Sequence, residues 1–187
     1  MLWHCAELAS SDHATLIERD DGYEFRGVAA LPLEDAPAHI EYEIEIATGW
    51  QAQRASAEIS TPAGVRTIEL QRAATGQWLV DGGRAAHLDG CTELDLAWTP
   101  ATNTIPMRRL DLPRGEAASI TAAWIRYPEL DVVANRQTYT RLAIDRWHYD
   151  AGEFQFEIVT DPTTGLVLAY GDDLWRAAAT AFALSVR

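Results

Sequence analysis

Apolar and polar residues alternate with a period of two along most of the chain, and this pattern predicts short antiparallel β-strands. The clearest example is residues 40–46, where four apolar residues alternate with three glutamates. One face of that strand should be buried and the other solvated. The same reasoning predicts strands over residues 2–9, 14–19, 23–30, 55–59, 68–70, 78–80, 94–98, 120–127, 138–147, 154–158 and 166–170.

Turn signals separate these strands at short intervals. Asp20-Asp21-Gly22 is a strong hairpin signal, and residues 31–38 carry two prolines and predict a loop. No low-complexity linker and no repeat of fixed period divides the chain. Short strands at regular spacing within one unbroken segment indicate a single all-β antiparallel domain over residues 1–187.

Helix signals are confined to two segments. Residues 172–184 begin with two aspartates, which favour a first helical turn, and continue with an apolar stripe and several alanines. This segment is predicted to form a helix that packs on the sheet. Residues 106–110 are the shorter alternative, and Pro113 limits their length.

The strand over residues 120–127 is apolar on both faces, so both faces should be covered. A sheet of many strands also leaves edges that must be paired or protected. We therefore expect a homodimer, with this strand as a candidate for burial under the second copy.

Residues 94–112 combine a strand with an unusual pair of arginines. Pro100 and Pro106 fix the chain ahead of Arg108 and Arg109, which lie in an otherwise apolar run and need partners if they are buried. Neighbouring side chains diverge on a strand and on a helical turn alike. One arginine is therefore expected to bind a structural carboxylate, and the other to lie at the mouth of an apolar space.

Charge and composition exclude several classes of partner. The net charge of −13 and the pI of about 4.7 argue against nucleic acid and against an anionic membrane surface. Cys5 and Cys91 lie far apart and have no metal-ligand spacing, which is typical of buried reduced thiols. The absence of a signal-peptide pattern and of any long apolar run predicts a cytoplasmic protein without a stable membrane anchor.

No standard catalytic or cofactor motif is present, so we predict no catalytic residue, no metal and no cofactor. Seven tryptophans and six tyrosines accompany arginines placed in apolar strands, which suits an aromatic pocket for an amphiphile with an acidic or polyhydroxylated head. Strand-edge arginines paired with Glu129 or Asp131 remain an alternative. The candidate ligand-binding residues are Trp98, Arg108, Arg109, Trp124, Arg126, Tyr127, Tyr139 and Arg141.

Four motifs, NTIPMRRL, AAWIRYPEL, TYTRLAI and GLVLAYGDDLW, together resemble the putative glycolipid-binding family, formerly a domain of unknown function. The resemblance covers almost the whole chain. It implies a many-stranded antiparallel β-roll or half-barrel wrapped around a single α-helix, similar to the bacterial lipoprotein-carrier half-barrels. It also implies a homodimer, and no catalytic residues are established for the family. The single helix is either the alanine-rich tail or the segment near Arg108.

Three functions follow as hypotheses. The first is binding of a lipid or glycolipid in an apolar, aromatic-lined interior with arginines near its mouth. The second is a hydrolase acting on a sugar or lipid ester. Its only support is the abundance of carboxylates and arginines near aromatic residues. The third is a non-catalytic dimeric scaffold whose apolar groove is an interface between copies.

Overall fold

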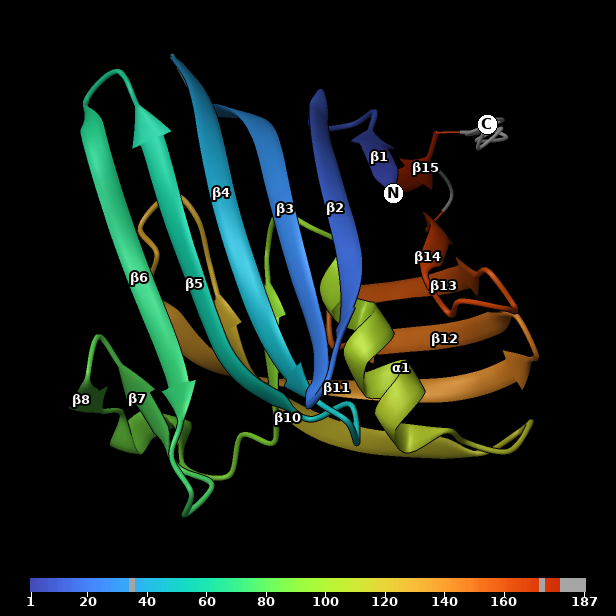
Figure 1. Ribbon diagram of the computed structural model, residues 1–187. Helices are drawn as coiled ribbons and strands as arrows, with labels where there is room; N and C mark the ends of the chain where they lie inside the picture. The colour runs from blue at the N-terminus through green and yellow to red at the C-terminus, as the bar shows by residue number, and fades with distance from the viewer. Residues whose placement is uncertain (34–35, 172–173, 179–187) are drawn as a thin grey trace.

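The computed structural model describes residues 1–33, 36–171 and 174–178. These residues form one 15-stranded sheet that curls around a short helix, α1 (Thr104–Leu110) (Figure 1). The sheet is antiparallel except where β9 runs parallel to β10. The prediction of a mainly β half-barrel around a single helix is therefore confirmed for the described residues. The strands are β1 (Leu2–Cys5), β2 (Ser10–Arg19), β3 (Gly22–Leu33), β4 (Ala36–Ala47), β5 (Ala52–Thr61), β6 (Gly64–Arg72), β7 (Trp78–Val80), β8 (Gly83–Arg84), β9 (Glu93–Leu96), β10 (Ala117–Ile125), β11 (Val132–Ala143), β12 (Arg146–Ala151), β13 (Phe154–Thr160), β14 (Val167–Tyr170) and β15 (Trp175–Ala177), with 3₁₀ turns η1 (Ala86–Leu88) and η2 (Ala101–Asn103).

The strand order divides the sheet into two halves that meet in its middle. Strands β8 to β1 lie side by side in reverse chain order, and β15 to β9 continue the sheet beyond β1. The two halves are joined where β1 pairs with β15, with Trp3 opposite Ala177. In Figure 1 the long strands β2 to β6 cross the direction of β10 to β13 steeply, and α1 lies between the two halves.

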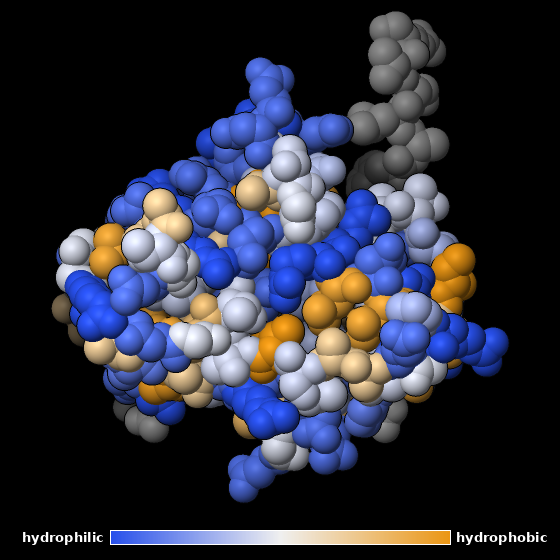
Figure 2. Space-filling model, turned by 90° about the horizontal axis from the view of Figure 1, so that it is seen from below, coloured by the Kyte–Doolittle hydropathy of each residue, from blue (hydrophilic) through white to orange (hydrophobic). Residues whose placement is uncertain are grey.

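The outward faces of the long strands are polar, as the alternation predicts. On β4, Glu41 and Glu45 are exposed while the apolar residues between them are buried. Seen from below, apolar residues reach the surface only in small groups separated by polar ones (Figure 2). Within the described residues, no helix combines the length and apolar character that crossing a membrane requires.

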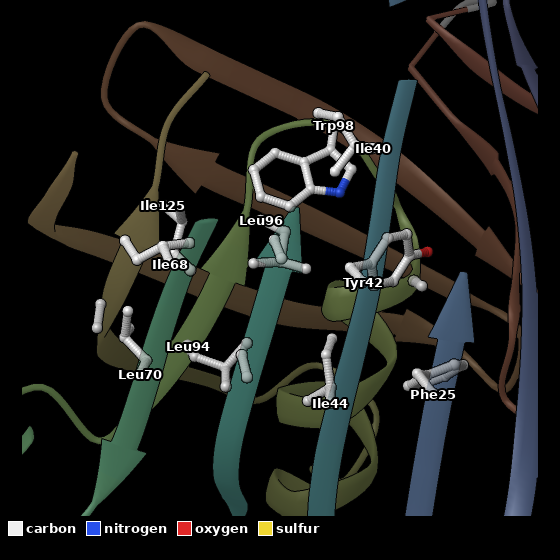
Figure 3. Packing of buried hydrophobic residues seen from close by; sticks show 14 of the residues in the cluster. Phe25, Ile40, Tyr42, Ile44, Ile68, Leu70, Leu94, Leu96, Trp98 and Ile125 are labelled. Atoms are coloured by element: carbon white, nitrogen blue, oxygen red, sulfur yellow. The ribbon is translucent and has the colours of Figure 1, made fainter. Parts of the chain in front are cut away.

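The inward faces form the main core. Ile40, Tyr42 and Ile44 of β4 belong to one buried cluster with Leu94 and Leu96 of β9 (Figure 3). Burial of each such aliphatic side chain stabilises the fold by roughly 1.5–3 kcal/mol. A second cluster packs Met107 of α1 against the inner faces of β10 to β14. The helix therefore contributes to both clusters, with Ile105 in the main core and Met107 in the second.

The predicted loop over residues 31–38 is wrong where the structure describes it, because both of its prolines lie in strands; residues 34–35 lie outside the described residues. Pro32 of β3 is directly opposite Pro37 of β4. Pairing of β3 with β2 ends at Ala30, and pairing of β4 with β5 begins at His39. Pro32 therefore lies beyond the end of its pairing with β2, and Pro37 before the start of its pairing with β5. Neither proline's missing N–H removes a hydrogen bond to those outer strands.

The predicted helix over residues 172–184 is also wrong where the structure describes it. Trp175 to Ala177 form β15, which pairs with β1 and β14; residues 172–173 and 179–187 lie outside the described residues. The two ladders outweigh the helical preference of the alanines. The shorter alternative over residues 106–110 is correct, since it falls within α1.

Two strands end earlier than predicted. The first strand, expected over residues 2–9, ends at Cys5. The strand expected over residues 138–147 is divided by a turn, since β11 ends at Ala143 and β12 begins at Arg146. Neither glycine nor proline marks that turn, so the usual signal was missing.

Both faces of β10 are covered by the chain itself. Ile120 and Ala122 belong to the cluster that packs on α1, whereas Ala123 and Ile125 belong to the main core. The two apolar faces therefore require no second copy at this strand, and the homodimer stays a prediction of the resemblance.

Candidate functional site

A cleft of about 1000 Å³ lies between the two halves of the sheet. Elements far apart in the sequence contribute to it, because the curled sheet brings the ends of its strands together. Its lining consists of Leu8, Pro32, Ala36, Thr61, Pro62, Ala63, Arg66, Asp95, Leu96, Ala97, Thr99, Pro100, Asn103, Trp124, Arg126, Tyr127, Pro128, Glu129, Asn135, Tyr149, Phe154, Phe156, Tyr170, Leu174 and Trp175.

One wall of the cleft is a row of aromatic rings from β12, β13 and β14. The ring of Tyr170 lies 5.7 Å from that of Tyr149 and 5.0 Å from that of Phe156, and Phe154 follows at 6.5 Å from Phe156. The row begins at buried Tyr149 and ends at Phe154, which is 53% exposed. It therefore offers a continuous apolar surface from the interior to the mouth.

The buried end of the cleft is polar. The Asp95 carboxylate accepts hydrogen bonds from Thr102 Oγ1 at 2.6 Å and from Gln137 Nε2 at 2.7 Å. The Tyr139 hydroxyl lies 2.9 Å from Asn103 Oδ1 and 3.1 Å from Gln137 Oε1. This network fixes the orientations of Asp95 and Asn103, which both border the cleft.

Burial sets the protonation of these groups. It raises the pKa of Asp95, against the opposing effect of its hydrogen bonds from Thr102 and Gln137. Burial also raises the pKa of Tyr170 well above its ordinary value. The tyrosine hydroxyls therefore stay protonated at neutral pH and remain available as donors and acceptors.

A second buried carboxylate holds the segment before α1 in place. Thr99 Oγ1 donates to Asp12 Oδ2 at 2.6 Å, and the Tyr42 hydroxyl donates to the same oxygen at 2.9 Å. Asp12 belongs to β2 and Tyr42 to β4, whereas Thr99 follows β9 and borders the cleft. These bonds tie the N-terminal half of the sheet to the cleft's polar end.

Asp12 should make the fold more stable in mild acid. Burial raises its pKa from 3.8 to about 6, so between these values the folded state binds more protons than the unfolded state. The stabilisation is therefore present at low pH and is lost as the pH rises through 6. Between pH 8 and pH 5 we expect a gain in unfolding free energy of roughly 1–2 kcal/mol from this group. Urea melts of wild type and Asp12→Asn at both pH values measure it, and an equal pH dependence in both proteins would contradict it.

Three of the predicted ligand-binding residues line the cleft. They are Trp124, Arg126 and Tyr127. Arg126 forms a two-point ion pair with Asp131, with Nε 3.0 Å from Oδ1 and Nη2 bonded to Oδ2, and its guanidinium lies 5.9 Å from the Trp124 ring. The other lining arginine, Arg66, donates to the carbonyl oxygen of Pro128. Both guanidinium groups thus have protein partners.

The other five predicted residues do not line the cleft. Trp98 is fully buried in the main core, and Tyr139 is buried behind the polar end. Arg109 Nε lies 2.5 Å from Glu93 Oε1. Arg108 is exposed and lies 4.7 Å from the Trp50 ring, away from the cleft. Arg141 donates to the carbonyl oxygens of Leu112, Ala143 and Ile144.

Sequence reasoning missed the polar end of the cleft. Asp95 alternates with Leu94 and Leu96, so the pattern assigned it to a solvated face; β11 and η2 instead cover that face. Phe154 and Phe156 carried a usable signal, because their alternation places both rings on one face of β13. The described residues contain no group of three or more His, Cys, Asp or Glu placed to hold a metal ion.

Comparison with known proteins gives one family and one solved structure. The model of the family described as "Putative glycolipid-binding" matches residues 1–176. The crystal structure of a DUF1089 family protein from Pseudomonas aeruginosa is 30% identical, with a TM-score of 0.80; the match covers 89% of this chain and 92% of that one. None of the curated proteins matches the chain.

Proposed function

The chain belongs to the putative glycolipid-binding family, and from this premise we propose that its cleft binds one amphiphilic lipid that carries a sugar head group. The observation that supports the proposal is the cleft of about 1000 Å³, which combines an aromatic wall with a buried polar end. Ligand pockets in proteins range over roughly 300–1000 Å³, so the volume suits a ligand as large as a lipid.

The two surfaces of the cleft suit the two parts of such a ligand. Aromatic and aliphatic side chains gain roughly 25 cal/mol for each Å² of apolar surface removed from water, which favours an alkyl chain. Buried hydrogen-bonding groups set the orientation and the specificity of a ligand. Asp95 and Asn103 provide such groups beside the apolar wall.

Binding can be measured directly with octyl β-glucoside below its micellar concentration. Trp124 and Trp175 line the cleft, so their fluorescence should respond to an occupant. Native mass spectrometry of the purified protein, followed by solvent extraction, tests for lipid retained from the host cell. We expect saturable binding of the glucoside and a retained amphiphile.

A matched pair of variants tests whether the glucoside binds in the cleft. Phe154→Asp puts a charge on the aromatic wall, and Ile144→Asp makes the same change at a residue that is 71% exposed and does not line the cleft. The first change should weaken octyl glucoside binding about tenfold or more, equivalent to about 1.4 kcal/mol, and the second should not alter it. Equal affinities in the two variants, or no binding by the wild type, would contradict the proposal.

A further inference from the structure

The charges of the cleft do not favour an anionic ligand. Its two lining arginines, Arg66 and Arg126, already contact a carbonyl oxygen and the Asp131 carboxylate. Glu129 also lines the mouth, and Asp95 lines the buried end. An ionised Asp95 would repel a phosphate or carboxylate head group, and the lining offers no unpaired arginine to offset the cost of desolvating such an anion.

The buried end still has hydrogen-bonding capacity to offer. A carboxylate has about four acceptor positions; Asp95 accepts from the Thr102 and Gln137 side chains and also interacts with the backbone N–H of Leu96, which leaves one position for a ligand. Asn103 accepts through Oδ1 from Tyr139, and its Nδ2 group makes no hydrogen bond within the described part of the chain. Asn135, which also lines the cleft, makes no side-chain hydrogen bond to the described residues.

These free positions include an acceptor on Asp95 and donors on the two asparagines. A sugar hydroxyl both donates and accepts, so neighbouring hydroxyls can donate to Asp95 and accept from an asparagine amide. A phosphate can satisfy only the donors, and a quaternary ammonium group has no hydrogen bond to offer. The apolar faces of a sugar ring can also pack on the rings of Tyr149 and Tyr170.

The apolar part of the ligand has its surface at the other end of the cleft. Leu8 and Phe154 line the mouth and are 44% and 53% exposed. An alkyl chain that leaves the polar end would follow the aromatic row toward these residues.

We infer that the cleft binds its amphiphile with the head inward: an uncharged, polyhydroxylated head group bonds to Asp95 and the neighbouring asparagines, while the alkyl chain extends to the mouth. This inference rests on the proposed function and deepens it. The sequence-based expectation allowed an acidic or a polyhydroxylated head group beside arginines; the inference keeps the polyhydroxylated head and gives it Asp95 and the asparagines as partners in place of arginines.

Three octyl amphiphiles with different heads test the inference at pH 7.5: octyl β-glucoside, octyl phosphate and octyltrimethylammonium. Wild-type protein should bind the glucoside about tenfold or more tightly than either charged compound, since unpaired or repelled groups in a desolvated site lose at least that much affinity. Asp95→Asn should weaken glucoside binding and reduce the difference in affinity between the glucoside and octyl phosphate. Leu142→Asp, at an exposed residue outside the cleft, serves as the control.

A second variant covers the case in which Asp95→Asn does not fold. Asn135→Ala removes a side chain that makes no hydrogen bond to the described residues, so it should fold normally and still lose glucoside affinity about threefold or more. Equal or tighter binding of octyl phosphate or octyltrimethylammonium by the wild type overturns the head-inward inference but leaves amphiphile binding intact. Failure of all three compounds to bind overturns the proposed function as well.

Discussion

Arg109→Met should destabilise the protein by roughly 3–5 kcal/mol at pH 8, because it leaves the Glu93 carboxylate buried without its partner. Glu93 is fully buried on β9, and neither of its oxygens accepts a hydrogen bond with good geometry from the described residues. Burial raises its pKa from 4.5 to about 7, despite the opposing effect of Arg109. At pH 8 the group is therefore largely charged and depends on the ion pair.

Arg108→Met is the matched control. The Arg108 guanidinium is exposed over Trp50, a contact worth about 0.5–1 kcal/mol, and methionine keeps the apolar stem of the side chain. Urea melts of both variants at pH 8 and pH 5.5 measure the difference. The penalty of Arg109→Met should shrink at pH 5.5, because protonation then removes the charge on Glu93.

A double variant separates the charge from the packing. Glu93→Met combined with Arg109→Met should recover most of the lost stability, since a buried ion pair can often be replaced by apolar side chains of similar volume. Equal, small losses for Arg108→Met and Arg109→Met, with no pH dependence, would show that the pair is not a structural device.

The local pattern predicted the strands because side-chain alternation depends only on neighbouring residues. Residues 40–46 show this clearly, since every apolar position there is buried. The same reasoning failed at Trp175 to Ala177, where pairing with β1 decides the structure. That partner lies more than 170 residues away, so no local propensity could reveal it. The central helix is a similar case, because two candidate segments were compatible with the same local signals.

The candidate site was only partly predictable for the same reason. Trp124, Arg126 and Tyr127 lie within one motif and reach the cleft together. The expectation that one of the two arginines binds a structural carboxylate agrees with the ion pair between Arg109 of α1 and Glu93 of β9. The sequence did not name Glu93 as that partner. Asp95 was missed because a strand face opposite the core is normally solvated, whereas here the sheet curls over and covers both faces of β9.

The second large effect is expected at Gly27 of β3, which lies directly opposite Tyr42 of β4. A methyl group at this position would lie 2.1 Å from Cζ of the Tyr42 ring, far inside van der Waals contact. Gly27→Ala must therefore displace the ring and pull its hydroxyl away from Asp12 and Thr99. Overpacking and an incompletely bonded buried carboxylate together should cost roughly 3–5 kcal/mol.

A control and a double-mutant cycle test this assignment. Gly49→Ala adds the same methyl group at a place where no described residue other than its two chain neighbours has an atom within 4 Å, so it should change stability little. Tyr42→Ala is itself destabilising, but in that background Gly27→Ala should become neutral or slightly stabilising, because alanine suits a strand interior better than glycine. The coupling between the two positions should then reach about 3 kcal/mol in urea melts. An equal cost of Gly27→Ala with and without the Tyr42 ring would mean that glycine is required at position 27 for its backbone and not for the ring that covers it.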